Sequence, residues 1–577
     1  MEIMLLTLPN STTETLSYTK GYYSVIGDTA TLAEAASNSW TFTTQSSLGY
    51  DNDFGNHSLD VLLLAETRET KSHSVSATGY GLDFLQLDEL SNITSLTTAG
   101  ENKIPEIAGS SGHSRVAGFV GRVNYNYADR YYVEASVRYD GSYLFGGMNR
   151  RWVVLPGASV AWRINKENWF NASWVNNLKL RGGIGKTATS GISSFQWMNT
   201  MALNQNAVVI GGASQSDITA SVLGNPNLTW AQCLNYNIGL DATLWNGLFG
   251  MELDAFYKYE YGKLSTVTGA YPPSSGGYYF STANVNKVDY KGFDLTLSHY
   301  NTVGDFFYSM KVVWSYAYAR WLKYAGDSEN APEYQRLTGK QVGAQRGLVA
   351  DGLFQTQEEI DNSATDPSRP AYPGYIRYVD LNGDGTISIQ QDLAYVGRST
   401  VPTHTGSFNF YASWKGFDID LLFSWGLGHD IAIQGIYSGT EGAANGSHGA
   451  TSFSRPFYQL GNAPEYLVVN SWTPENPDAE FPCLEITPRS LNNGYASTFW
   501  YRKGDYIRLK TAQIGYTFPK KWMSRIGVET LRIYLEGYNL LTFSALSKFN
   551  IDPESPSVQN GYYPQQRTMT LGVKLTF

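Results

Sequence analysis

The chain has 577 residues and a formal net charge of −9, and only 16% of its residues are charged, below the roughly 25% typical of soluble proteins. This charge leaves no basic surface for a nucleic-acid partner, and no stretch approaches the roughly 18 apolar residues of a membrane-spanning helix. Aromatic residues nevertheless make up 14% of the chain, while its mean hydropathy is −0.29. Such averages fit membrane-spanning strands, which alternate lipid-facing and lumen-facing residues, and they also fit a soluble β-protein.

Residues 1–37 are the first segment in chain order. Their opening letters, MEIMLL, place an acid where a secretory signal needs Lys or Arg, and the apolar run is too short for such a signal. Because a membrane barrel must be exported, we interpret residues 1–37 as part of an extracellular loop or as a truncated start.

Two-residue alternation dominates residues 38–577. Over residues 131–139, Tyr, Val and Ala share one face, while Tyr, Glu, Ser and Arg share the other. Residues 408–414 and 417–425 alternate in the same way on either side of a Lys-Gly turn. A bilayer requires roughly 9–11 residues per strand, whereas strands of soluble sheets average about five or six. We therefore predict that residues 38–577 form an antiparallel transmembrane β-barrel.

Connections between these strands alternate between short and long. The longest polar loops, residues 325–404 and 431–503, are expected on the extracellular side, because outer-membrane barrels have short periplasmic turns and longer external loops. About fifteen strands are recognisable, whereas plugged outer-membrane transporters use about 22. The sequence thus predicts an all-β, multi-pass outer-membrane chain with an incomplete barrel.

The last residues read as a final barrel strand. Met569, Leu571, Val573, Leu575 and the terminal Phe577 alternate with polar residues and Gly572. A terminal aromatic residue of this kind is typical of the signal that barrel-assembly machinery recognises by strand addition, a mode driven by backbone pairing. The alternative is an ordinary terminal strand of a soluble sheet.

Residues 380–388, DLNGDGTIS, match the first nine positions of an EF-hand-type calcium loop. Hard cations need several oxygen ligands in a compact turn, and a glycine permits the bend. The candidate ligands are Asp380, Asn382, Asp384, Thr386 through its carbonyl, Ser388, and Asp392 in place of the carboxylate that Gln391 lacks. The sequence predicts bound Ca²⁺ or Mg²⁺ in the 380–392 loop, and the alternative is a metal-free turn stabilised by Asx and Gly residues.

Aromatic residues in the long loops are candidates for stacking on the apolar faces of sugar rings. The sequence singles out Tyr278, Tyr279, Tyr375 and Trp472, and the alternative is that these residues pack the loops together. No HExxH, GxSxG or P-loop pattern occurs in a suitable setting, and the two cysteines, about 250 residues apart, form no metal-binding pair. An enzyme is therefore not expected.

Several segments resemble the SusC/RagA-like family of TonB-dependent outer-membrane transporters. They are DGLFQ at 351–355, PGYIRYV at 373–379, SWTPENP at 471–477, GDYIRLK at 504–510 with GYTFP at 515–519, and LRIY at 531–534 before GYNL at 537–540. The resemblance extends over residues 115–577, and the region before it matches only as generic barrel.

This resemblance implies a barrel of about 22 strands with an N-terminal plug, a SusD-like surface lipoprotein that acts as a lid, and energy from the TonB complex. Substrates of the family are mostly oligosaccharides and sometimes peptides. The plug and the TonB-contacting box are not found in this chain, so TonB would act through the missing N-terminal part. The expected surroundings are outer-membrane lipid. A passive porin and a soluble all-β glycan-binding protein are the alternatives left open.

Overall fold

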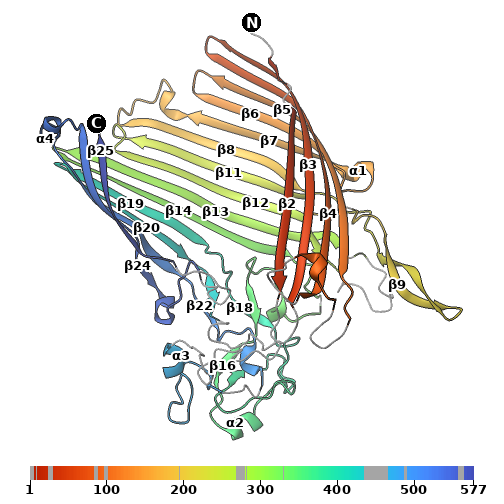
Figure 1. Ribbon diagram of the computed structural model, residues 1–577. Helices are drawn as coiled ribbons and strands as arrows, with labels where there is room; N and C mark the ends of the chain where they lie inside the picture. The colour runs from red at the N-terminus through yellow and green to blue at the C-terminus, as the bar shows by residue number, and fades with distance from the viewer. Residues whose placement is uncertain are drawn as a thin grey trace. The chain divides into compact units, whose positions relative to one another are not determined.

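The computed structural model describes residues 5–7, 10–23, 30–82, 89–95, 102–193, 195–267, 280, 282–328, 330–433, 465–485, 490–555 and 565–577 (Figure 1). Within these residues, seventeen strands belong to one hydrogen-bonded sheet. They are β1 (Leu5–Thr7), β2 (Asn10–Tyr23), β3 (Ala30–Phe54), β4 (His57–Leu82), β5 (Glu106–Tyr127), β6 (Tyr131–Ser142), β7 (Trp152–Arg163), β8 (Val175–Thr189), β11 (Ala231–Leu244), β12 (Phe249–Thr266), β13 (Thr282–Val303), β14 (Phe306–Lys323), β19 (His404–Trp414), β20 (Phe417–Leu427), β23 (Tyr506–Thr517), β24 (Thr530–Ser544) and β25 (Thr568–Thr576).

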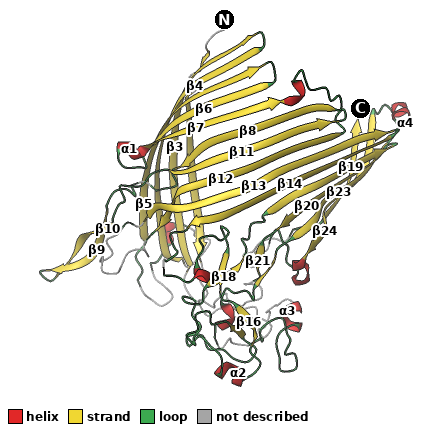
Figure 2. Ribbon diagram, turned by 180° about the vertical axis from the view of Figure 1, so that it is seen from behind, coloured by secondary structure: helices red, strands yellow, loops and turns green. Residues whose placement is uncertain are grey.

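The remaining strands lie outside the large sheet. Four two-stranded sheets pair β9 (Thr200–Ile210) with β10 (Ala213–Val222), β15 (Gln345–Gly347) with β18 (Ala394–Gly397), β16 (Ala350–Leu353) with β17 (Ile376–Tyr378), and β21 (Asp430–Ala432) with β22 (Tyr501–Lys503). The helices α1 (Met148–Arg151), α2 (Gln357–Asp361), α3 (Glu465–Val469) and α4 (Lys520–Met523) are small beside the strands (Figure 2). None of the helices in the described part of the chain is long and apolar enough to cross a membrane.

The chain divides into two compact units. Unit 1 comprises Met1–Trp162, Gly182–Tyr236 and Tyr259–Lys287, and unit 2 comprises Arg163–Arg181, Asn237–Lys258 and Val288–Phe577.

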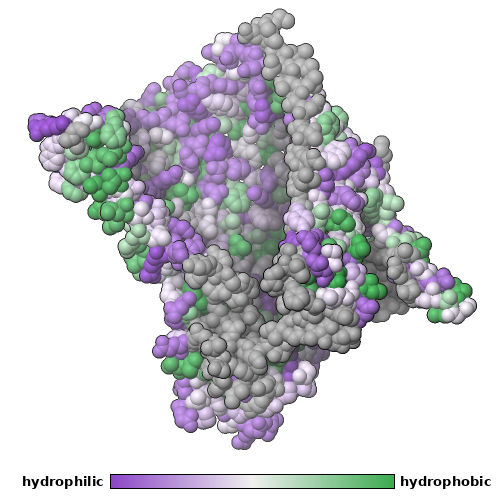
Figure 3. All heavy atoms as spheres, viewed as in Figure 1, coloured by the Kyte–Doolittle hydropathy of each residue, from purple (hydrophilic) through white to green (hydrophobic). Residues whose placement is uncertain are grey.

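In unit 1, strands β3 to β7 pair with their sequence neighbours in antiparallel register. The register places one set of apolar side chains on a single exposed face. It includes Leu63 on β4, Phe119 and Val123 on β5, Val133, Val137 and Tyr139 on β6, and Val154 and Val160 on β7. The alternate side chains of these strands, on the opposite face of the sheet, are mostly polar. Hydrophilic residues gather over β6 and β7 in the view of Figure 3. An exposed apolar face on strands of this length is what a lipid-facing barrel wall requires.

In unit 2, β14, β19, β20, β23, β24 and β25 pair consecutively in antiparallel register. The turn between β19 and β20 consists of Lys415 and Gly416, both with positive φ, at 47° and 92°. Two central residues with φ above zero form the type of turn that matches the twist of the flanking strands. The hairpin predicted around this Lys-Gly pair is therefore confirmed.

Residues 1–37 contain a strand that their sequence pattern does not indicate. Residues 10–23 form β2, which pairs with β3 from Asn10↔Thr44 to Tyr23↔Thr31, so this part of the segment is strand. Its interpretation as part of an extracellular loop or as a truncated start stays a prediction. The segment is rich in Ser and Thr and lacks regular apolar alternation, so its strand state comes from the backbone ladder with β3. This difference also raises the strand number above the predicted fifteen, since β1 and β2 both pair with β3.

Candidate functional site

The long loops of unit 2 fold into a structure with its own hydrophobic core. We call residues 324–328, 330–403, 428–433, 465–485, 490–505 and 545–555 the loop module. Its buried apolar residues are Leu348, Leu353, Ile376, Tyr378, Ile387, Ile431, Ile433, Leu467, Phe481, Tyr495, Trp500, Leu546, Phe549 and Ile551. Full burial of a large apolar side chain is worth roughly 1.5–3 kcal/mol, so a cluster of this size can hold loops of this length in one conformation.

Three of the family-like segments meet inside this module, and a fourth, GDYIRLK, begins at its end. DGLFQ and PGYIRYV pair as β16 and β17, with Leu353 opposite Ile376. SWTPENP contacts DGLFQ through Trp472, whose indole Nε1 donates to Gln355 Oε1 at 2.8 Å. GDYIRLK is tied to the β20 end by Asp505, whose carboxylate accepts from the Gly428 backbone N–H at 2.7 Å. The motifs that are scattered in sequence thus form one connected structure.

Gly374 shows how closely these segments pack. Its φ is +85°, and a Cβ at this position would lie 2.4 Å from the Trp472 ring and 2.8 Å from Cys483 Cβ. The Gly374 carbonyl accepts from the Cys483 N–H at 3.0 Å. Only glycine satisfies both the left-handed backbone and the missing space.

The 380–392 loop adopts a compact turn held by its own side chains. Asp380 accepts from the backbone N–H groups of Gly383 and Gly385 at 2.7 and 2.8 Å. Asn382 Oδ1 accepts from the Asp384 N–H, and Asp384 Oδ1 accepts from the Thr386 N–H and hydroxyl. These are Asx-type hydrogen bonds, which the alternation of Asp and Asn predicts.

Asp392 has a different role from the other candidate ligands. It is fully buried, and its two carboxylate oxygens accept from the Leu381 and Ser388 N–H groups, both at 2.8 Å. Ser388 Oγ bonds to the side chain of Gln390. Asp392 therefore closes the loop at its base, as a twelfth-position carboxylate would, but through backbone N–H groups.

The surroundings of this turn shift the pKa values of Asp384 and Tyr334. Hydrogen bonds from Thr386 and Asn382 hold the pKa of Asp384 below its usual value. Burial raises the pKa of Tyr334, and the nearby carboxylates of Asp392 and Asp380 raise it further. Within the described residues, no group of three or more His, Cys, Asp or Glu side chains is arranged to hold a metal ion. The oxygen atoms of the turn come from two carboxylates, one amide and a backbone carbonyl, and the carboxylate and amide oxygens already accept hydrogen bonds within it.

The predicted sugar-stacking residues fall in different environments. Tyr375 is only 1% exposed, its hydroxyl donates to Glu485, and burial together with that carboxylate raises its pKa. Its ring therefore packs the loop module in this structure. Trp472 is half-buried and donates to Gln355, and Tyr278 and Tyr279 lie outside the described residues.

Charged side chains on the strands of unit 2 form pairs that sequence reasoning did not identify. Arg532 on β24 pairs with Asp418 on β20 and also donates to Gln513. Arg508 on β23 is fully buried and pairs with Asp552 and Glu554 in the loop module. Arg508 and Asp552 are 44 residues apart, so no local pattern could have indicated the pair.

Phe577 follows β25 and is 85% exposed. The β25 strand pairs with β24 from Thr530↔Thr576 to Tyr538↔Thr568. The predicted recognition of Phe577 by assembly machinery stays a prediction.

Long antiparallel strands with an exposed apolar face, together with a large folded loop module, define a membrane β-barrel as the class of protein. The family model described as "TonB dependent receptor-like, beta-barrel" matches residues 6–540, and the chain belongs to that family. The predicted antiparallel barrel fold, the SusC/RagA-type kinship and the outer-membrane location are thereby confirmed.

Relatives and solved structures agree with this assignment. TonB-dependent receptor P26 of Formosa agariphila is 27% identical over 92% of this chain and 53% of its own length. TonB-dependent receptor SusC of Bacteroides thetaiotaomicron is 24% identical over 82% of this chain and 45% of its own. A structure of the RagAB peptide transporter matches the whole chain and 60% of its own with a TM-score of 0.71 at 21% identity. The chain thus spans about half the length of the curated relatives that it matches.

Proposed function

We propose that this chain is the barrel portion of an outer-membrane importer for oligosaccharides that works with a SusD-like surface lipoprotein and draws energy from TonB. The observation that carries the proposal is the loop module, because three family-like segments, DGLFQ, PGYIRYV and SWTPENP, converge there on one packed core. A structured external surface of this kind suits a lid protein that docks on it. Peptides are the second candidate cargo, since the RagAB peptide transporter shares this fold.

Uptake in living cells tests this function. We expect deletion of the gene to abolish uptake of a fluorescent oligosaccharide and growth on it, with growth on the corresponding monosaccharide unchanged. An uncoupler of the proton gradient should stop uptake in the parent strain. Uptake that continues in the presence of the uncoupler would mean a passive porin instead. A labelled peptide that enters only the parent strain, with no oligosaccharide uptake, would shift the cargo to peptides.

The Asp380 turn is proposed to bind Ca²⁺ weakly. Its Asx hydrogen bonds already set the bend, and Asp380, Asn382, Asp384 and the Thr386 carbonyl supply oxygen donors of the type that calcium prefers. Few charged ligands imply a dissociation constant on the order of 10⁻⁴–10⁻³ M, as in extracellular modules.

Terbium luminescence measures this cation site directly. We expect Tb³⁺ to bind the purified chain with sensitised emission that Ca²⁺ displaces, and Asp384→Asn to reduce the emission strongly. The matched control is Asp361→Asn at the exposed end of α2, which should leave the emission unchanged. Equal emission from the parent and Asp384→Asn would identify the turn as metal-free.

A further inference from the structure

A cavity opens on the exposed apolar face of unit 1, where that face gives way to charged residues. On β4, Ala65, Thr67 and Glu69 follow Leu63 at every second position and therefore lie on the same face of the sheet. Glu69 lies opposite Arg115 on β5 and Phe42 on β3, so these three side chains form one row across three strands on the lipid-facing side.

The level of this row follows from strand length. On β5, the stretch from the tight turn at Tyr127 to Ala117 spans 11 residues, within the roughly 9–11 that a barrel strand needs to cross the hydrocarbon. Arg115 lies two residues farther along and therefore at the height of the lipid headgroups. Since tight turns are periplasmic in such barrels, this is the outer leaflet.

Aromatic rings form the floor of the cavity. Trp152 lies flat over Gly141, where an added Cβ would approach the indole to 2.7 Å. Its ring stacks on Tyr139 with centroids 4.7 Å apart, and on Phe119 at 6.3 Å. Aromatic side chains at the membrane interface favour this position, because their apolar bodies contact acyl chains while their edges meet headgroups.

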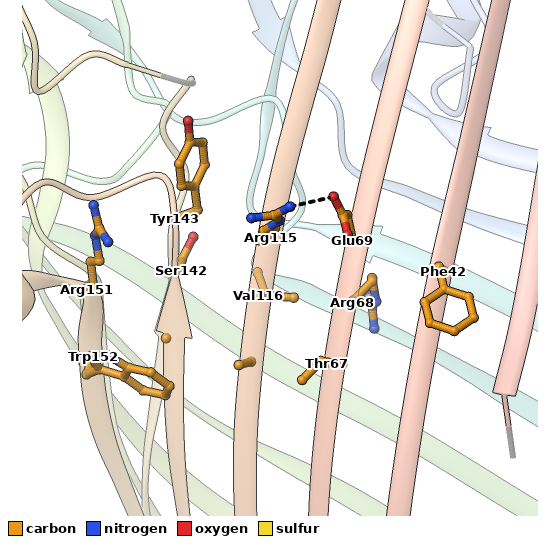
Figure 4. A pocket seen from close by; sticks show the side chains of 12 residues that line it. Phe42, Thr67, Arg68, Glu69, Arg115, Val116, Ser142, Tyr143, Arg151 and Trp152 are labelled. Atoms are coloured by element: carbon orange, nitrogen blue, oxygen red, sulfur yellow. Dashed lines mark hydrogen bonds and ion pairs between the residues drawn. The ribbon is translucent and has the colours of Figure 1, made fainter. Parts of the chain in front are cut away.

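The charged rim has more positive than negative groups. The cavity of about 650 Å³ is lined by Arg115 and Arg151, with Glu69 as the one acid among its lining residues (Figure 4). Arg68 also lines it, although Arg68 belongs to the opposite face of β4 and lies 3.5 Å from Glu66. Arg115 Nη2 donates to Glu69 at 2.9 Å, yet the arginine side chain remains 60% exposed. Lys71, next on the same face, lies 3.7 Å from Glu69 and over the Trp40 ring. Glu69 thus binds Arg115, lies close to Lys71, and also accepts from His113 Nε2 at 2.8 Å, all beside an aromatic floor.

We infer that this cavity is a binding site for the phosphorylated headgroup of an outer-leaflet lipid. Clustered Lys and Arg at headgroup level attract phosphate, and Arg binds it through a planar fork. The aromatic floor contacts the glycerol or sugar backbone and the first methylenes of the acyl chains. Glu69 orients Arg115 in the absence of lipid and competes with phosphate for it.

Lipid retention by the purified chain tests the site, with diphosphoryl lipid A as the probe and phosphatase-treated lipid A as its phosphate-free counterpart. After extraction in detergent, native mass spectrometry counts bound lipid across a titration. We expect Arg115→Gln to weaken diphosphoryl lipid A binding about fivefold, the equivalent of one basic group near a charged surface. Glu69→Gln should strengthen it, because the competing carboxylate is lost.

The matched control is Arg122→Gln. Arg122 lies on the same strand as Arg115 but on the opposite face of the sheet, where it pairs with Asp60. It should bind lipid like the parent. Equal binding by Arg115→Gln and Arg122→Gln, or equal retention of the two lipid A forms, would overturn the inference. Complete displacement of lipid A by millimolar inorganic phosphate would assign the site to free phosphate and would also overturn it. If Arg115→Gln does not fold, the opposite shift of Glu69→Gln decides the question.

Discussion

Arg508→Ala is expected to destabilise the attachment of the loop module to β23 by about 3–5 kcal/mol, the usual cost of removing one partner from a buried ion pair. Arg508 is fully buried, and its Nη2 contacts both Asp552 carboxylate oxygens at 2.7 Å. Its Nη1 lies 2.6 Å from Glu554 Oε2. Without the guanidinium, the partly buried carboxylates of Asp552 and Glu554 would lose their shared cation, while Glu554 would keep Lys510 at 3.2 Å and the Tyr506 hydroxyl at 3.3 Å.

The measurement is limited proteolysis of the protein in outer membranes, followed by mapping of cuts within residues 545–555. We expect rapid cleavage there in Arg508→Ala and slow cleavage in the parent. Arg508→Lys should be intermediate, since an ammonium group cannot reproduce the planar fork. The control is Lys510→Ala, whose half-exposed side chain also contacts Glu554 and should contribute less than about 1 kcal/mol. Equal protease resistance of Arg508→Ala and Lys510→Ala would contradict the prediction.

The strands of the sheet could be predicted where the membrane imposes its own pattern. Residues 131–139 face lipid and lumen in turn, so every second side chain is apolar and the register follows. The Lys415-Gly416 turn was readable because its positive φ angles favour glycine. β2 was missed, since its Thr and Ser side chains carry no apolar signal and the ladder with β3 determines its conformation.

In the candidate site too, local contacts could be predicted from the sequence and long-range contacts could not. The turn that begins at Asp380 was predictable because its Asx hydrogen bonds join residues two to five positions apart, although the bond from Leu381 to Asp392 that closes the loop spans eleven. The loop module core was not, since Leu348, Ile376, Phe481 and Trp500 come from distant segments with no common period. Tyr375 illustrates the consequence, because a loop tyrosine looks the same in sequence whether it is exposed for ligand or buried against Glu485.

Trp500→Ala is expected to unfold the loop module while the sheet stays in the membrane. Trp500 is fully buried, packs edge-on to Phe499 at 4.9 Å and stacks near Phe481 at 6.4 Å. Its indole Nε1 donates to the Asn493 carbonyl, and its own carbonyl accepts from the Ile433 N–H. Truncation of a buried Trp to Ala costs about 3–5 kcal/mol, which is a large part of the stability of a domain of this size.

Two readouts separate the module from the sheet. Protease added to intact cells should cut Trp500→Ala within residues 465–505, where the parent resists, while heat-modifiable migration on gels remains unchanged for both. The control is Trp522→Ala on α4, whose side chain is 55% exposed and should change stability by no more than about 0.5 kcal/mol. If Trp500→Ala loses heat-modifiable migration together with protease resistance, the module and the strands form one cooperative unit. Retention of both would mean that the buried indole does not organise the loops. Selective loss of the module would leave a membrane-inserted barrel without its folded loops. Under the proposed function, oligosaccharide uptake should then stop, because the proposed lid protein would lose its docking surface.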